Sequence, residues 1–167
     1  KDGNIYGLIS KDGNNSGCAK FTHSINTIER IDCSTNNKVI HNYYDNGKLE
    51  STHTFTKIID FKNTYTYKPN KVIIEKTVKN VVKSVTVISK DNHGNITEIV
   101  TNFLDSENSM SIIPINHLSN VVTYNILKKD KFGNPLETLI TSTDIYEDTS
   151  KNTQKERKEF IKYEYYN

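Results

Sequence analysis

Two five-residue strings of this chain, residues 91–95 (DNHGN) and 130–134 (DKFGN), share the pattern Asp-x-x-Gly-Asn. A type I turn followed by a left-handed glycine closes a three-residue hairpin loop with a bulge. Aspartate favours the first position because its carboxylate accepts hydrogen bonds from nearby backbone N–H groups. The pattern therefore predicts two β-hairpin tips. A shorter string, Asp45-Asn46-Gly47, predicts a third tip with a two-residue type I′ loop and Asp45 opposite Lys48.

The position of each tip predicts which residues of its two arms lie opposite each other. Pairing the loop ends places Tyr124 opposite Ile140 in one hairpin and Val87 opposite Ile99 in another. The apolar residues that these registers bring to shared faces are Tyr124, Ile126, Leu136 and Ile140 in the first hairpin, Val85, Val87 and Ile99 in the second, and Ile40, Tyr44, Leu49 and Phe55 in the third.

The composition favours strands over helices. Ten tyrosines and six phenylalanines accompany abundant Thr, Val and Ile, which suit a pleated surface. A hydrophobic content of 34% is low for strands buried on both faces, so each strand is expected to have one dry face and one wet face. The predicted class is mainly β: a twisted antiparallel β-meander, a hairpin array that either stays open or curls toward a half-barrel or sandwich. Residues 1–167 are expected to form one domain.

Other segments carry weaker patterns. Residues 21–32 predict a strand pair, although Ser24 could instead cap a helical turn. Pro69-Asn70 predicts a further reversal. Residues 147–158 are highly charged and predict a connection, either loop or short helix, before a closing strand over 159–166. A short strand over 5–9 and an edge or crossing segment over 110–118, which contains a proline, complete the expected order.

Charge and targeting signals narrow the class of partner. Lys and Arg total 22 against 20 acidic residues, and the two signs are interspersed, so no nucleic-acid partner is expected. No apolar run approaches the length of a membrane span. The chain starts without methionine and is expected to have been trimmed. Cys18 and Cys33 form either one disulfide or a pair of buried thiols, and both alternatives stay open.

Candidate chemistry is sparse. His41 and His53 belong to one hairpin, but the register places His41 opposite Thr52 and His53 opposite Ile40, on opposite faces, so no shared metal is expected. Asp91 and its neighbours resemble part of a calcium loop without the closing Glu, which favours a turn. The carboxylates Asp144, Glu147 and Asp148 lie in a polar stretch typical of a solvated loop. No catalytic residue, metal or cofactor is predicted.

Tyrosines are the better lead to a binding surface. More of them occur than one small core face accommodates, and tyrosine on a sheet face can stack on sugars or contact a protein. The alternative is cross-strand aromatic pairing that only stabilises the sheet. The candidate ligand or partner contacts are Tyr43, Tyr65, Tyr67, Tyr163 and Tyr165, with Tyr166 beside them.

The strings at residues 43–49 (YYDNGKL), 90–96 (KDNHGNI) and 129–135 (KDKFGNP) resemble the Tyr-Asp (YD, Rhs-type) repeats of bacterial cell-surface proteins. They also look like the hairpins of secreted or lipoprotein-type β-meander proteins of Bacteroidetes, and residues 163–167 (YEYYN) are similar to the opening of such a unit. The resemblance implies an extracytoplasmic β-scaffold, in the periplasm, on the outer membrane surface or secreted, without a catalytic centre in the repeats.

Three functions follow as hypotheses. The first is a non-enzymatic scaffold or binding protein of the bacterial cell envelope, with a glycan, lipid or envelope protein as partner. The second is a carrier of a lipid or small hydrophobic ligand, whose cavity is lined by the apolar face that includes Val85, Val87, Ile99, Tyr124, Ile126 and Ile140. The third is a hydrolase with an unrecognised site.

Overall fold

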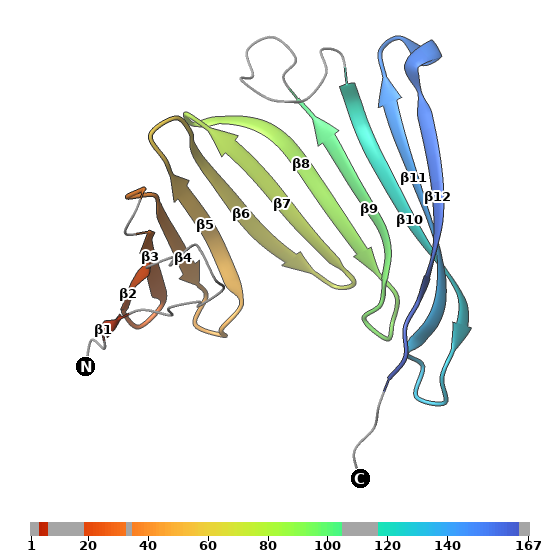
Figure 1. Ribbon diagram of the computed structural model, residues 1–167, viewed down its shortest axis with the longest axis horizontal. Coiled ribbons are helices and arrows are strands. Elements are labelled where there is room, and N and C mark those ends of the chain that lie inside the picture. The colour runs from red at the N-terminus through yellow and green to blue at the C-terminus, as the bar shows by residue number, and fades with distance from the viewer. Residues whose placement is uncertain (1–3, 7–18, 33–34, 105–116, 164–167) are drawn as a thin grey trace, which may run out of the picture. The chain divides into compact units, whose positions relative to one another are not determined.

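The computed structural model describes residues 4–6, 19–32, 35–104 and 117–163, and these form strands joined mostly by tight turns (Figure 1). The strands are β1 (Asn4–Tyr6), β2 (Ala19–His23), β3 (Thr27–Asp32), β4 (Lys38–Tyr43), β5 (Leu49–Phe55), β6 (Asp60–Lys68), β7 (Lys71–Val78), β8 (Val81–Lys90), β9 (Ile96–Phe103), β10 (His117–Lys129), β11 (Pro135–Tyr146) and β12 (Thr153–Phe160). A short 3-10 helix, η1 (Thr149–Lys151), precedes β12.

The strands follow one another in the sheet in the order of the chain, from β1 to β12. Neighbouring strands pair antiparallel, as in β4 with β5 and β10 with β11. The sheet is open, because β1 and β12 are its outermost strands. The predicted fold class, a mainly β antiparallel meander, is confirmed. Among the described residues, no helix has the length and apolar character needed to cross a membrane.

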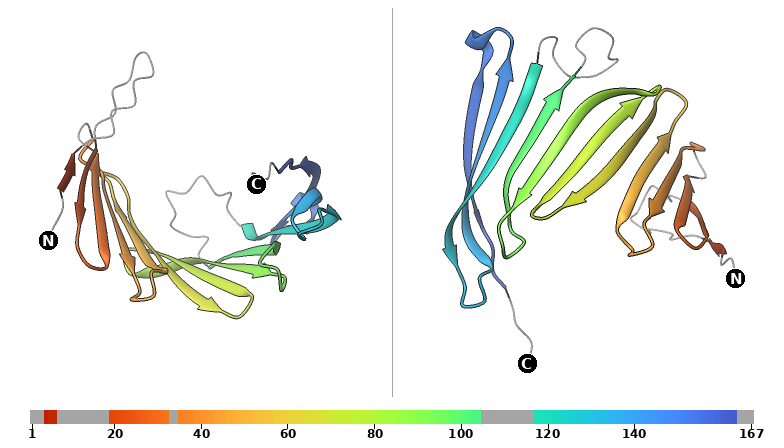
Figure 2. Two further views of the ribbon diagram at one scale, coloured as in Figure 1. Left: turned by 90° about the horizontal axis from the view of Figure 1, so that it is seen from below. Right: turned by 180° about the vertical axis from the view of Figure 1, so that it is seen from behind.

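The meander divides into two compact units. Unit 1 comprises residues 1–66 and 74–82, and unit 2 comprises residues 67–73 and 83–167. Within each unit the described strands form a single layer (Figure 2). The single domain expected over residues 1–167 stays a prediction.

The two Asp-x-x-Gly-Asn tips fold as predicted. In the first, the backbone N–H of Asp91 donates to the carbonyl of Asn95 at 2.9 Å, and Gly94 has a φ of 84°. In the second, Asp130 N–H donates to the Asn134 carbonyl at 3.0 Å, and Gly133 has a φ of 89°. Only glycine adopts this left-handed conformation without steric cost, which explains its fixed place in both strings.

The third tip differs from its predicted two-residue loop. Tyr44 N–H donates to the Lys48 carbonyl at 2.8 Å, so the loop is Asp45-Asn46-Gly47 and has three residues. A type I′ loop needs a positive φ at both central residues, but here Gly47 has one (77°) and Asn46 does not. All three glycine tips are therefore of one kind.

The turns that join β6 to β7 and β7 to β8 also contain residues with a positive φ. The positive φ of Asn70 (56°) accompanies the predicted reversal at Pro69-Asn70. Lys79 and Asn80 have φ values of 49° and 64°, the two left-handed residues of a type I′ turn that joins β7 to β8. The sequence analysis did not predict this turn, because lysine is an uncommon residue at a left-handed position.

Bulges decide which registers were predicted correctly. Between β10 and β11 the pairing shifts twice near the tip, and Tyr124 lies opposite Ile140 as expected. Between β8 and β9 it shifts only once, so Val87 lies opposite Val100 and not Ile99, and Ile88 takes the place opposite Ile99. The predicted register of this hairpin is wrong by one residue. A shift of one residue exchanges the two faces of β8 relative to β9.

The corrected registers change the predicted apolar face of unit 2. Val85 and Val87 point to the opposite side of the sheet from Ile99, so they do not join the lining proposed for a carrier. We name the corrected surface the Ile140 face; its apolar members on β8 to β11 are Ile88, Ile99, Val122, Tyr124, Ile126 and Ile140.

Burial is slight on both faces. Among the described residues, Ile140 is the one hydrophobic side chain that is buried, at 4% exposure. The other members of the Ile140 face are half-buried, and so are Val85 and Val87. The expected dry face is therefore not found in the described part of the chain, because a single layer of strands has no second layer to pack against.

The two ends of the described chain contain one confirmed prediction and one error. Residues 21–32 form the predicted strand pair, β2 and β3, without a helical turn. Residues 153–158 were expected in a loop or short helix, but they belong to β12, which pairs with β11. All eight residues of β12 are exposed, and an edge strand with two wet faces accommodates charged side chains. Residues 5 and 6 of the strand predicted over 5–9 belong to β1, while residues 7–9 and most of the segment predicted over 110–118 lie outside the described residues.

Candidate functional site

A hollow of about 520 Å³ lies where β10, β11 and the end of β12 meet, beside the glycine tip at Gly133. Its apolar lining comes from Leu136, Phe160 and Ile161, with Tyr163 beyond the end of the strand. Lys128, Asp130, Glu137 and Lys162 line the rest of the hollow. The lining of the hollow therefore combines apolar side chains with charged side chains of both signs.

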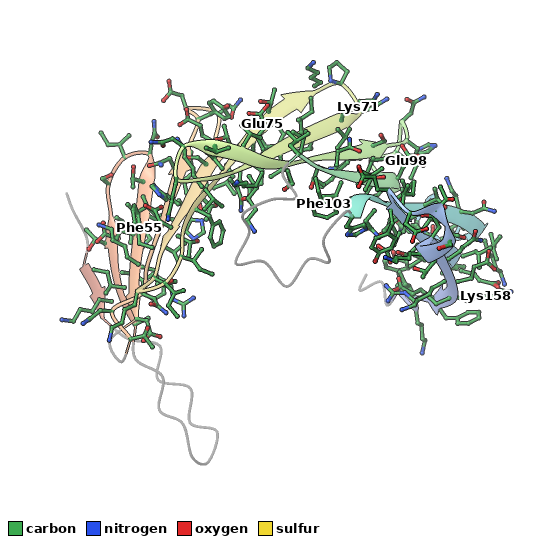
Figure 3. The ribbon with its side chains drawn as sticks, turned by 90° about the horizontal axis from the view of Figure 1, so that it is seen from above. Phe55, Lys71, Glu75, Glu98, Phe103 and Lys158 are labelled. Atoms are coloured by element: carbon green, nitrogen blue, oxygen red, sulfur yellow. The ribbon has the colours of Figure 1, made fainter. Side chains whose placement is uncertain are left out.

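Backbone pairing places these residues. Lys128 lies opposite Glu137 at a bulge, and Glu137 lies opposite Phe160 on the other side. The N–H of Ile161 donates to the Leu136 carbonyl at 3.0 Å, which continues the pairing beyond β12. Lys158, labelled in Figure 3, donates to Glu137 at 3.2 Å and so holds that carboxylate at the edge of the hollow.

Two aromatic rings of the hollow are exposed to solvent. Phe160 is 73% exposed and Tyr163 is 37% exposed, so both rings are accessible for stacking. The charged groups around them can donate and accept hydrogen bonds. Such an arrangement can hold a ring with polar substituents, as a sugar has.

The structure places the predicted tyrosines at different sites. Tyr43 ends β4 and Tyr65 belongs to β6, with β5 between these strands. Tyr67 also belongs to β6 and, like Tyr43 and Tyr65, is half-buried. Of the five predicted contacts, Tyr163 lines the hollow, and Tyr165 lies outside the described residues, as does Tyr166. Tyr43 and Tyr65 belong to unit 1, and Tyr67 and Tyr163 belong to unit 2.

A buried histidine forms a second cluster in unit 2, at the start of β10. The imidazole of His117 lies between two rings: Tyr146 is stacked on it at 4.6 Å between centroids, and Phe103 is tilted against it at 4.7 Å. Phe103, at the end of β9, is labelled in Figure 3. The His117 side chain is 9% exposed, so three neighbouring strands contribute to one aromatic stack.

Asp144 on β11 is the centre of the polar contacts beside this stack. Its Oδ1 accepts a hydrogen bond from Asn120 Nδ2 at 2.8 Å, and its Oδ2 accepts one from Thr153 Oγ1 at 3.2 Å. His117 Nε2 lies 3.3 Å from Asp144 Oδ1. The orientation does not make this last contact a hydrogen bond, so the buried Nε2 has a charged neighbour without a directed partner.

This His117 cluster was missed by sequence reasoning. Asp144 was expected in a solvated loop with Glu147 and Asp148, but it belongs to β11 and is half-buried. Asp144 reaches its partners only through pairing with β10 and β12, which the sequence does not show directly. Among the described residues, no serine, threonine or cysteine is hydrogen-bonded to His117 Nε2, and the cluster joins side chains of neighbouring strands.

The predicted placement of His41 and His53 is confirmed. His41 lies opposite Thr52, with Nδ1 3.2 Å from the hydroxyl, and His53 lies opposite Ile40. His53 contacts Asp60 at 2.6 Å, and its ring lies 3.8 Å from that of Phe55. Within the ranges that the structure describes, no three His, Cys, Asp or Glu side chains gather as metal ligands.

The Asp91 carboxylate is engaged by its own turn. Its oxygens accept hydrogen bonds from the Asn95 side chain at 3.0 Å and from the backbone N–H groups of Asn95 and His93, both at 2.9 Å. Mainly because of the Asn95 side-chain hydrogen bond, the pKa of Asp91 falls from its ordinary 3.8 to about 2. The carboxylate thus serves the turn, as the sequence indicated.

The lowered pKa predicts how the turn responds to acid. A carboxyl group whose pKa is lower in the folded state stabilises that state when ionised, so the contribution is complete above pH 3.8 and is lost as the pH falls through about 2. Asn95→Ala is expected to raise the pKa of Asp91 toward 3.8. The carbon chemical shift of the Asp91 carboxyl, followed by NMR against pH, measures both values. Identical titration curves for the two proteins would contradict the assigned cause.

Cys18 and Cys33, expected as a disulfide or as two buried thiols, lie outside the described ranges. No model of a known protein family, no curated protein and no solved structure matches this chain, so its sites are interpreted from their own geometry.

Proposed function

We propose that this chain is a non-enzymatic β-scaffold of the bacterial cell envelope that binds a glycan in the hollow around Phe160 and Tyr163. The observation that carries the proposal is the exposure of the two rings in a hollow that also contains charged groups. Sugar rings present apolar C–H faces and polar edges, and they are recognised by this combination of aromatic and charged side chains.

The scarcity of buried side chains supports a binding role. Ile140 is the one buried hydrophobic residue of the described part, while many apolar side chains stay accessible. Exposed apolar surface on a folded protein is typical of sites that bind another molecule. A single layer of strands offers both of its faces for such contacts, which suits a scaffold better than an enzyme with an enclosed active site.

The location at the envelope is supported by the likeness of the three glycine tips to Tyr-Asp repeats. The structure makes this likeness more uniform, because Gly47, Gly94 and Gly133 all occupy the same position of the same kind of loop. The family assignment and the location remain parts of the proposal.

The proposed function is tested with an array of bacterial surface glycans and with purified peptidoglycan. The chain is expected to bind at least one glycan class. Because an aromatic contact contributes about 0.5–1.5 kcal/mol, Tyr163→Ala is expected to weaken binding by about two- to tenfold. Tyr163→Phe keeps the ring and serves as the matched control. Absence of binding to every glycan, or equal loss in both variants, would refute the proposed role of the ring.

A further inference from the structure

Two neighbouring tips of unit 1 carry a group of exposed aliphatic side chains. The connection from β5 to β6 presents Ile58 at 78% and Ile59 at 43% exposure. The start of β8, directly after the turn from β7, presents Val81 at 52% and Val82 at 37%. Alternation of strand direction brings both tips to the same end of unit 1, where they lie side by side (Figures 1 and 2). We name these four residues the aliphatic rim.

The backbone holds the rim rigidly. Thr56 Oγ1 accepts hydrogen bonds from the N–H groups of Ile58 at 3.2 Å and Ile59 at 2.8 Å. The Thr56 N–H donates to the Ile59 carbonyl at 2.8 Å and closes the turn. The other tip is a tight turn through left-handed Lys79 and Asn80. Ile58 and Ile59 therefore lie in a short closed turn, and Val81 and Val82 begin a strand directly after one, so little backbone conformational entropy is lost when they are bound.

Positive charge accompanies the aliphatic rim. Lys57 directly precedes Ile58, and Lys79 lies two residues before Val81; both lysines are exposed. Residues 56–59 (TKII) and 78–82 (VKNVV) contain no acidic side chain. A carboxylate, Asp60, directly follows Ile59, and it lies 2.6 Å from the imidazole of His53. The rim thus combines apolar tips with two adjacent cations.

The opposite end of unit 1 lacks this combination. Ile25 is fully exposed there, in the turn between β2 and β3, but polar Ser24 and Asn26 flank it. Asn26 donates to the carboxylate of Asp45 in the neighbouring tip at 2.7 Å. Ile25 therefore has polar neighbours and no flanking lysine, whereas Ile58 follows Lys57 directly and Val81 follows Lys79 by two residues at the other end.

We propose that the aliphatic rim docks on an anionic lipid surface. Its aliphatic side chains enter the boundary between headgroups and acyl chains, while Lys57 and Lys79 lie at the level of the lipid phosphates. Apolar burial and attraction to anionic lipid act together in interfacial binding. Lysine suits this position because its aliphatic stem lies along apolar surface while the ammonium reaches the headgroups. This docking uses unit 1 and does not depend on the glycan hollow of unit 2.

Co-sedimentation with vesicles tests the docking. The chain is expected to sediment with vesicles of equal parts phosphatidylglycerol and phosphatidylcholine, and much less with phosphatidylcholine alone. Ile58→Ser combined with Val81→Ser is expected to weaken binding to the anionic vesicles at least about tenfold, since each change removes an aliphatic insertion. Lys57→Gln combined with Lys79→Gln is expected to have an effect of about tenfold or more. Ile25→Ser, which removes an exposed isoleucine from the acidic end, is expected to leave binding unchanged.

Three results would each overturn the docking proposal. They are failure to sediment with the anionic vesicles, equal binding to both kinds of vesicle, and a loss of binding in the Ile25→Ser control equal to that of the rim variants. Sedimentation velocity without lipid is measured in parallel. If the native chain dimerises and Ile58→Ser with Val81→Ser makes it monomeric, the rim is an interface between two copies and the lipid assignment is wrong. Circular dichroism verifies that each variant keeps its strands, and glycan binding by the same variants is measured separately.

Discussion

Ile140→Ala is expected to lower the free energy of unfolding of unit 2 by about 2–4 kcal/mol, the usual effect of removing a buried isoleucine. Ile140 is the buried hydrophobic residue of the described chain, at 4% exposure, and it lies opposite Tyr124 on β10 and Arg157 on β12. The substitution removes a buried apolar side chain where β11 pairs with β10 on one side and β12 on the other. Amide hydrogen exchange of β10 and β11 measures the loss directly.

Leu139→Ala is the matched control for this prediction. Leu139 is adjacent in sequence and belongs to the same strand, but it points to the other face and is half-buried. Because less apolar surface is lost, we expect a loss of about 1 kcal/mol. If both variants lost the same stability, burial on the Ile140 face would not be what holds these strands together.

Asp144→Ala is expected to destabilise the same region by about 1–3 kcal/mol. The carboxylate accepts hydrogen bonds from Asn120 on β10 and Thr153 on β12, so its removal leaves both donors without that acceptor. The effect is largest for two partly or fully buried groups. Asn120 would lose an acceptor of its side-chain N–H, and the buried Nε2 of His117 would lose its charged neighbour. Faster amide exchange at the ends of β10, β11 and β12 is the expected observation.

Asp148→Ala separates this role from a general effect of losing a carboxylate. Asp148 caps η1 by accepting a hydrogen bond from Ser150 N–H at 3.1 Å, and it is exposed. Loss of such a cap is expected to affect only the short helix and the start of β12. A loss spread over β10 after Asp148→Ala, or no change after Asp144→Ala, would contradict the assigned role of the His117 cluster.

The sequence predicted the hairpin tips well because their signals are local. The five residues 91–95 contain the aspartate, the glycine and the asparagine that close the loop, and all their contacts lie within the turn. The tip at Gly47 was predicted with the wrong loop because Asn46-Gly47 suits two turn types. The choice between them depends on whether Tyr44 or Asp45 pairs across the loop, and both residues fit either place.

The registers beyond the tips were harder to predict. One bulge reverses the faces of a strand, and two bulges restore them. The β10–β11 pairing has two shifts near its tip and agrees with prediction at Tyr124, while the β8–β9 pairing has one and does not. The His117 cluster was missed for a related reason, since His117 and Asp144 are distant in the sequence and meet only through pairing.

The strand order has a consequence for how the molecule forms. Each described strand neighbours the strands that precede and follow it in the chain. In an array of this kind, stability comes mainly from the contacts between nearest neighbours. Assembly is expected to start at any hairpin and spread outward, and the reverse process to begin at the outermost strand β12, whose eight side chains are all in water.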